Sequence, residues 1–246
     1  MGTETWLNPS IASSEFFPPN YEVLRQDRSD SYGGVLLAIK KDYIADSLTL
    51  PAELSCEAVF AKLTIGRCQS LIVGSVYRPP GNDSVYNQSL CNAVQWITSM
   101  NKGAAIWIGG DFNLPDINWN TSSICGHQNS QQINNEFLDM VHSCAFEQCV
   151  NFPTRNENTL DLFLSNRPGL VNRCSPVPGI GDHDIVFVDS LVSAKRAKQQ
   201  QRKIFLWKNA SKTNLRKCQQ HLPMNLPTLF VQHQTLKQCG MKLRLT

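Results

Sequence analysis

Two polar residues follow one of the most apolar segments of the chain. The segment Ile106 to Gly110 is strand-like and ends in two glycines, after which Asp111 and Asn113 appear. Alternation along an extended chain aims these two side chains the same way and returns Phe112 to the core. A carboxylate can take a proton from water while an amide holds that water or a phosphate oxygen. Taken alone, the same residues also fit a plain Gly-Gly-Asp turn.

A second polar group combines an imidazole with two carboxylates. Asp182, His183 and Asp184 follow a glycine-rich stretch and precede the apolar run Ile185 to Val188. Such a group can place one carboxylate oxygen on a metal ion and the histidine on a charged phosphate. A polar surface loop is the alternative interpretation.

Three further residues could join these groups. Asp161 is the one carboxylate inside the apolar run Leu160 to Leu164, so burial would require a partner, for which His183 is the candidate. An edge-strand aspartate facing water is the alternative. Tyr77 ends a strong strand, where its hydroxyl could reach a phosphate, although buried tyrosines often only pack. Glu4 has no pattern of its own that indicates a role.

The elements that must position these residues are mostly short strands. Apolar, β-branched runs bounded by Gly or Pro predict strands at Tyr21 to Arg25, Val35 to Lys40, Ala58 to Ile65, Leu71 to Tyr77, Ala104 to Ile108, Leu160 to Ser165 and Ile185 to Val188. The first four should be antiparallel neighbours.

Two helices are expected between the strand groups. Asp83 or Ser84 can cap a helix carrying an apolar stripe, with an end near Lys102-Gly103. The stripe of this first helix consists of Val85, Leu90, Val94 and Ile97, and that of the second of Ile133, Phe137, Met140 and Val141. Strands outnumber helices, which favours an α/β fold of two packed β-sheets with helices on the outer faces.

Charge divides the chain into an acidic body and a basic tail. All 20 acidic residues lie between Glu4 and Asp189, together with only 11 Lys and Arg, whereas 12 basic residues follow from Lys195 onward. Net charge therefore gives no argument that the body binds nucleic acid. Nine irregularly spaced cysteines without a Cys-x-x-Cys pair argue against a disulfide framework and against a structural zinc site. With no apolar run long enough to span a bilayer, we expect a soluble intracellular protein.

Five short motifs in order resemble one family. They are Thr3 to Leu7, Tyr77 to Pro80, Gly109 to Asn113, Pro153 to Arg155 with Leu160 to Leu164, and Gly181 to Asp184. Together they are similar to the endonuclease/exonuclease/phosphatase superfamily, specifically the apurinic-like endonuclease domain of LINE-type (non-LTR) retrotransposons. The resemblance implies a deoxyribonuclease I-like sandwich of two β-sheets flanked by helices over residues 1–190, followed by a basic, poorly ordered tail over 191–246.

The resemblance also implies a reaction and a role for each candidate residue. The reaction is Mg²⁺-dependent hydrolysis of a DNA phosphodiester, in the nucleus, with DNA as the partner. The implied roles are metal binding by Glu4 with support from Asp182, activation of water by Asp111, phosphate binding by Asn113 and Tyr77, charge stabilisation by His183, and orientation of His183 by Asp161.

The sequence departs from the family at two places. The family's first strand, which carries an Asn that shares metal and phosphate binding, should precede Thr3 and is missing, so we expect a gap in one sheet and impaired activity. Gly181 stands where the family usually has Ser. Two alternatives remain open: a phosphatase of the same superfamily acting on a small phosphorylated substrate, and a non-catalytic remnant whose basic tail binds nucleic acid.

Overall fold

The computed structural model describes residues 1–30, 32–66, 69–196, 203–205 and 243–245. The chain forms two compact units, Met1–Ala197 and Lys198–Thr246. In the second unit, β14 (Lys203–Phe205) pairs antiparallel with β15 (Leu243–Leu245). Most of the predicted basic tail lies outside the described residues. The first part of the tail is described, and its residues Ala194 and Arg196 form isolated β-bridges to Ile65 and Tyr43, respectively.

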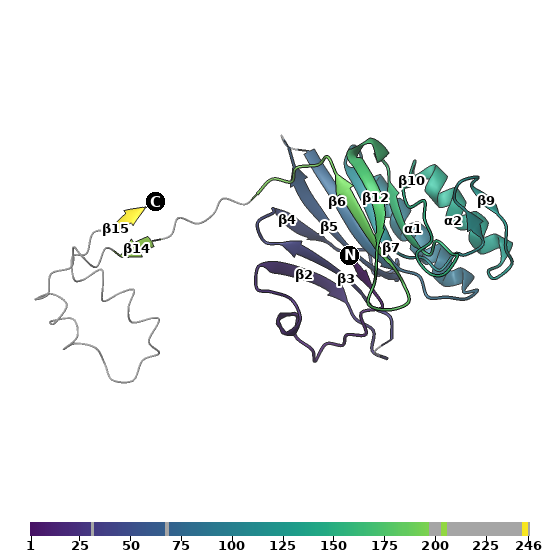
Figure 1. Cartoon of the computed structure of the whole chain (residues 1–246), viewed down its shortest axis with the longest axis horizontal. Coiled ribbons are helices and arrows are strands. Elements are labelled where there is room, and N and C mark those ends of the chain that lie inside the picture. The colour runs from purple at the N-terminus through teal and green to yellow at the C-terminus, as the bar shows by residue number, and fades with distance from the viewer. Residues whose placement is uncertain (31, 67–68, 197–202, 206–242, 246) are drawn as a thin grey trace, which may run out of the picture. The chain divides into compact units, whose positions relative to one another are not determined.

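A six-stranded sheet is the centre of the first unit (Figure 1). Its order is β10-β11-β7-β6-β5-β4, and every neighbouring pair is antiparallel except β6 and β7, which are parallel. The bounds are β4 (Ala45–Leu48), β5 (Glu57–Ile65), β6 (Gln69–Tyr77), β7 (Ala105–Asp111), β10 (Glu147–Gln148) and β11 (Asp161–Ser165). Among the described residues, this sheet therefore has the most strands.

Strands cover one face of the central sheet. A three-stranded sheet has the order β1-β3-β2, with β1 (Gly2–Thr3), β2 (Tyr21–Gln26) and β3 (Val35–Lys40). A separate pair consists of β12 (Val171–Val177) and β13 (Ile185–Ser190). Leu37 and Ile39 of β3, with Val186 and Val188 of β13, pack in one apolar cluster with Trp107 of the central sheet. Two layers of strands thus enclose one core.

Two helices cover the opposite face of the central sheet (Figure 1). They are α1 (Ser84–Met100) and α2 (Gln131–Ser143), and a short hairpin of β8 (Ile117–Asn118) and β9 (Ser123–Ile124) lies between them in sequence. Leu90, Ile97, Ile133 and Phe137 belong to the same buried cluster as Ile106 of β7. The expectation of helices on both outer faces was wrong for the described residues, because both helices share this one face.

The predicted strands are all present, but their grouping differs from the expectation. The first four form two antiparallel pairs, β2 with β3 and β5 with β6, and these pairs belong to different sheets. The sequence did not predict β4 or β12, whose Asp46, Ser47 and Pro176 interrupt an apolar pattern. Among the described residues, β4 is an edge strand and β12 pairs on one side only, so both tolerate polar residues and proline.

The first helix begins at the predicted cap, but its buried stripe differs from the prediction. The Asp83 side chain accepts a hydrogen bond from the Tyr86 N–H at 2.9 Å. Val85 is 79% exposed, whereas Leu90 and Ile97 are buried and Asn87 is fully buried. Val85 and Leu90 are five positions apart, which places them about 140° apart around a helix. Val85 was therefore wrongly included in the stripe.

Buried Asn87 contacts Arg78, which ties the end of β6 to the loop after β7. The Arg78 guanidinium is 1% exposed and donates to the Asn87 side chain at 3.3 Å. It also donates to the carbonyl oxygens of Gly81 at 2.8 Å and Asn113 at 3.2 Å. None of the described carboxylates forms an ion pair with Arg78. The loop carrying Asn113 is thus held by a buried cation bonded to neutral oxygens.

Gly110 is required by close packing of backbones within the sheet. The predicted strand ends at Ile108, but Gly109 and Gly110 also lie in β7 and pair with both β6 and β11. A methyl group at Gly110 would overlap the carbonyl oxygen of Val76 on β6. Only a residue without a side chain lets the main chain of β7 approach β6 here.

We predict that Gly110→Ala destabilises the protein strongly, because β7 must move away from β6 to admit the methyl group. The expected loss in the free energy of unfolding is at least roughly 2–3 kcal/mol, measured by urea denaturation. Gly169→Ala is the matched control, since nothing lies near the added carbon at this exposed position. Equal stability of the two variants would contradict the packing argument.

Candidate active site

Four polar residues lie side by side across four strands of the central sheet. Glu57 of β5 is the register partner of Tyr77 on β6, Tyr77 is the partner of Asp111 on β7, and Asp111 is the partner of Asp161 on β11. We call these four residues the polar row. Alternation along each strand puts the row on the face that carries Trp107, toward the second layer of strands. Three of the four were candidate site residues from sequence, and Glu57 was not.

Asp111 and Asn113 point the same way, as alternation predicts. The Asp111 carboxylate accepts hydrogen bonds from the Asn113 backbone N–H at 3.0 Å and from its side-chain Nδ2 at 2.9 Å. Asn113 Nδ2 also donates to the carbonyl oxygen of Arg78 at 3.0 Å, and its backbone has a φ of 47°. Phe112 is fully buried in the cluster on the helix side. Both amide hydrogens of Asn113 are thus committed, which leaves its Oδ1 free to accept.

The partner of Asp161 is His183. The His183 Nδ1 lies 2.7 Å from Asp161 Oδ2, which is the contact that the sequence analysis expects. Thr154 fixes both elements: its hydroxyl accepts from the Leu160 and Asp161 N–H groups at 3.0 Å, and its carbonyl oxygen accepts from the Asp184 N–H at 2.7 Å. With Nδ1 held by the carboxylate, Nε2 is the ring nitrogen available to a ligand.

Glu4 reaches the polar row from the segment after β1. Its Oε1 accepts a hydrogen bond from the Tyr77 hydroxyl at 2.7 Å. Glu4 and Trp6 have positive φ values of 47° and 54°, a backbone conformation that costs about 1–3 kcal/mol for residues other than glycine. The structure therefore brings together Glu4, Tyr77, Asp111, Asn113, Asp161 and His183.

Asp182 makes its ion pair outside this group. Its carboxylate lies 2.6 Å from Arg155, and both side chains are substantially exposed. A hydrogen bond from its own backbone N–H and the charge of Arg155 lower the pKa of Asp182. Although Asp182 precedes His183 in the chain, its carboxylate is therefore paired with Arg155.

Electrostatics in the site shift two pKa values upward. Burial raises the pKa of Asp111 from 3.8 to about 7, and the negative charges of Asp161 and Glu4 add to this effect. The Asn113 N–H and the charge of His183 oppose it. Burial alone would lower the pKa of His183, but the hydrogen bond and charge of Asp161 outweigh burial, so the pKa is raised. The site thus combines an easily protonated carboxylate with a readily charged imidazole.

The donor set fits a cation that needs few protein ligands. Within the described part of the chain, no three His, Cys, Asp or Glu side chains form a ready-made metal cluster. Glu4 and Asp111 nevertheless lie close enough for the Glu4 charge to raise the pKa of Asp111. Mg²⁺ is commonly held by one or two carboxylates together with substrate phosphate and water. The Glu4 carboxylate suits Mg²⁺, whose charge would also relieve its repulsion from Asp111.

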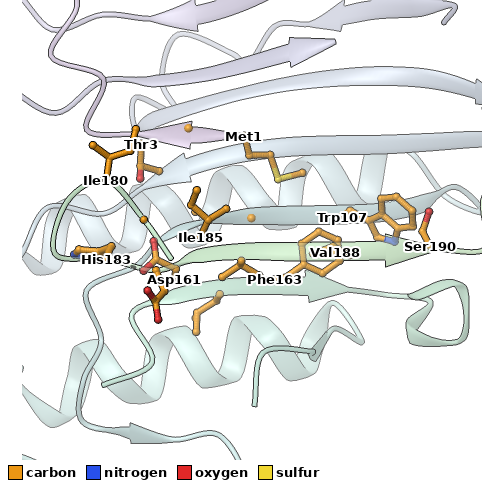
Figure 2. Close-up of a pocket in the computed structure, with 17 residues that line it drawn as sticks. Met1, Thr3, Trp107, Asp161, Phe163, Ile180, His183, Ile185, Val188 and Ser190 are labelled. Atoms are coloured by element: carbon orange, nitrogen blue, oxygen red, sulfur yellow. Dashed lines mark hydrogen bonds and ion pairs between the residues drawn. The ribbon is translucent and has the colours of Figure 1, made fainter. Parts of the chain in front are cut away.

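A pocket of about 530 Å³ adjoins the site, between β1 and β13 (Figure 2). Trp107 and Phe163 of the central sheet line it, as do Asp161 and His183 at one end. In the described residues, β1 pairs only with β3 and β13 only with β12, so the pocket lies between two strand edges without partners. The buried Nε1 of Trp107 has no hydrogen-bond partner there. This is the position at which the second layer of strands is discontinuous.

Sequence reasoning missed several residues that support the site. Arg78 and Arg155 stand inside motifs quoted for the family resemblance, but no role was assigned to either. The Thr154 contacts link segments that are distant in sequence, and no local pattern indicates them. For Glu57 the signal was a single carboxylate at the start of the strongly apolar run Ala58 to Ile65, the same signal that identified Asp161.

Comparisons with known proteins agree with the fold and the motifs. Residues 71–187 match the family described as "Endonuclease-reverse transcriptase". A similar solved structure is the "Endonuclease domain of TRAS1, a telomere-specific non-LTR retrotransposon", with a TM-score of 0.53 and 14% sequence identity over 70% of this chain and 79% of that chain. No curated protein matches the sequence significantly. No helix of the described residues is long and apolar enough to cross a membrane.

The family match covers β6, β7 and β11, which carry three members of the polar row, together with the His183 loop. The similarity in fold extends over the larger part of the chain. Residues 71–187 are therefore similar to the endonuclease-reverse transcriptase family, and the fold is similar to that of a retrotransposon endonuclease domain.

Proposed function

We propose that this chain is a Mg²⁺-dependent phosphodiesterase that nicks DNA by activating a water molecule. The observation that carries the proposal is the polar row, in which Asp111 has an amide on one side and the Asp161–His183 pair on the other. The match of residues 71–187 to the endonuclease-reverse transcriptase family favours a nucleic acid as the substrate. Hydrolysis of a phosphodiester needs an in-line water and charge neutralisation more than a covalent intermediate.

Asp111 is the general base in this proposal. A base works best when its pKa lies near the working pH, and burial raises the pKa of Asp111 to about 7. The attacking water would lie between the Asp111 carboxylate and Asn113 Oδ1, since both hydrogens of Asn113 Nδ2 are already donated within the protein. Asp111 takes the proton while Asn113 orients the water. The water oxygen bonds to phosphorus as the bond from phosphorus to the leaving sugar oxygen breaks, and that oxygen takes a proton from solvent.

His183 and Tyr77 stabilise the phosphate. With Asp161 on Nδ1, a charged His183 presents Nε2 as a donor to a phosphate oxygen, where negative charge develops. Tyr77 donates its hydroxyl hydrogen to Glu4 in this structure, and it would donate to a phosphate oxygen once a cation takes up the Glu4 carboxylate. Glu4 would hold Mg²⁺ together with substrate phosphate and water, and the ion would supply charge neutralisation and lower the pKa of bound water.

Plasmid nicking tests the proposed reaction. With Mg²⁺, the protein should convert supercoiled plasmid to the nicked form, and Asp111→Ala should lower the rate by about 10²–10⁴-fold because the base is lost. Asp139→Asn, an exposed change on α2, is the matched control and should keep full activity. Agarose gel electrophoresis follows the conversion.

Two outcomes of this assay would reject the proposal. One is cleavage that survives Asp111→Ala, which would mean that another group acts as the base. The other is turnover of a small phosphate ester with no action on plasmid, which would indicate a phosphatase of the same superfamily.

Asp161→Asn should shift the whole pH profile to lower pH. Asp161 raises the pKa of His183, so without this carboxylate the imidazolium is lost at a lower pH as the pH rises. Asp161 also raises the pKa of Asp111, so the base ionises at a lower pH as well. Both limbs of the profile of kcat/KM against pH should therefore move down, and NMR titration of His183 should give a lower pKa. A profile that keeps its position would show that the pair does not govern the reaction.

Asp111→Asn should stabilise the folded protein in a pH-dependent way. Because folding raises the pKa of Asp111 from 3.8 to about 7, ionisation of Asp111 destabilises the native state as the pH rises through this window. The variant removes this penalty, so its advantage in the free energy of unfolding should be roughly 2–3 kcal/mol greater at pH 8 than at pH 5. Urea denaturation in EDTA measures it. An advantage that does not change with pH would contradict the assigned shift.

A further inference from the structure

Glu57 is the member of the polar row to which no role has yet been given. It lies at the start of β5, opposite Tyr77, and is only 7% exposed. Its Oε2 accepts a hydrogen bond from the Gly34 N–H at 2.7 Å, and its Oε1 accepts from Arg28 at 3.2 Å. A buried carboxylate is costly unless it is paired and hydrogen-bonded, so its retention at this position calls for a structural reason.

The Gly33–Gly34 segment connects Glu57 to the Glu4 segment. The carbonyl oxygen of Gly33 accepts from the Trp6 N–H at 3.0 Å, and that of Gly34 accepts from the Thr5 N–H at 3.3 Å. Both glycines have positive φ, 71° and 85°. Glu57 therefore fixes the segment before β3, and the carbonyl oxygens of this segment accept hydrogen bonds from the two residues after Glu4.

Packing leaves this segment little freedom to move. A methyl group at Gly33 would lie 2.8 Å from Glu57 Oε2 and 3.1 Å from the Tyr77 ring. The Glu57 backbone N–H donates to the Tyr86 hydroxyl at 2.8 Å, which in turn donates to the Tyr77 carbonyl oxygen at 2.8 Å. Glu57 and Tyr77 are thus tied to each other as well as to the segment between them.

Glu4 needs such support, because its backbone is strained. Its φ of 47° and that of 54° at Trp6 persist only where surrounding contacts over-determine them. The hydrogen bonds from Thr5 and Trp6 to the glycines, and the one from Tyr77 to the Glu4 carboxylate, are such contacts. Two of these contacts depend on where Glu57 places Gly34.

We infer that Glu57 is a positioning residue that holds the Glu4 carboxylate in the site through the Gly33–Gly34 segment. It does not touch the reacting atoms. The inference rests on the proposed function, since it assigns Glu57 a role toward the cation that Glu4 would bind. Arg28 neutralises the buried charge of Glu57 through Nη1, while its other nitrogens pair with Asp30.

The test compares Glu57→Gln with Asp30→Asn. Glu57→Gln keeps the shape of the side chain but presents a neutral amide to Gly34 and Arg28. Asp30→Asn removes the outer partner of Arg28, whose side chain is 47% exposed, and leaves the Glu57 contacts in place. Binding of Mn²⁺ alone, followed by electron paramagnetic resonance, gives a readout that does not depend on catalysis. Hydrogen exchange of the Thr5 and Trp6 amides reports the position of the Glu4 segment.

For Glu57→Gln we expect Mn²⁺ binding about tenfold weaker and exchange of the Trp6 amide about tenfold faster. Plasmid nicking should fall at low Mg²⁺ and recover at high Mg²⁺, because the base and His183 are untouched. Asp30→Asn should behave as the wild type in all three measurements. If Glu57→Gln does not fold, Arg28→Met serves as the second variant. For it we expect exchange of the Trp6 amide to be faster than in the wild type, by less than tenfold.

The two hypotheses fail in distinguishable ways. Unchanged Mn²⁺ affinity and unchanged Trp6 exchange in Glu57→Gln, with normal nicking by the wild type, would overturn the positioning role and leave the proposed function intact. A wild type that does not nick DNA but binds Mn²⁺, with both readouts weakened in Glu57→Gln, would overturn the proposed function and keep the positioning role. A wild type that binds no Mn²⁺ would overturn both.

Discussion

The register of four strands is the constraint on which the candidate site depends. Glu57, Tyr77, Asp111 and Asp161 are consecutive partners across β5, β6, β7 and β11. A slip of one residue in any pairing would turn a side chain of the row to the opposite face of the sheet, among the apolar residues under the helices. The close approach of β7 to β6 at Gly110 opposes such a slip, because any side chain there would meet the backbone of Val76. The close packing of β7 against β6 and the geometry of the candidate site therefore depend on the same strand register.

The charges of the site are balanced unequally across the row. Arg28 neutralises Glu57 at one end, and His183 faces Asp161 at the other. Asp111, between them, has only hydrogen bonds from Asn113 and is raised in pKa by its own burial and by neighbouring carboxylates. The fold thus concentrates its electrostatic cost at Asp111, the residue that we propose as the general base, which is where stability and activity would compete.

Local patterns in the sequence predicted both helices and seven of the strands, whereas the choice of candidate residues such as Glu4 also needed the family resemblance. The apolar runs predicted β3, β5, β6 and β11, and the Asp161–His183 contact followed from the cost of an unpartnered carboxylate. Strand pairing was beyond reach, because periodicity shows which face a residue occupies and not which strand lies beside it. This is why the two helices were assigned to two faces and why Glu57 was overlooked. The Arg155–Asp182 pair, formed between two exposed loops, has no sequence signal either.

The parallel pairing of β6 and β7 has a consequence for the order in which the molecule assembles. Parallel neighbours cannot be joined by a hairpin, so the chain must first travel through α1 before Tyr77 and Asp111 meet. Glu4 then joins Tyr77 across a sequence separation of 73 residues. Contacts this distant form slowly, after local hairpins such as β5 with β6. A partly folded chain would therefore form much of its apolar core before the candidate site is complete.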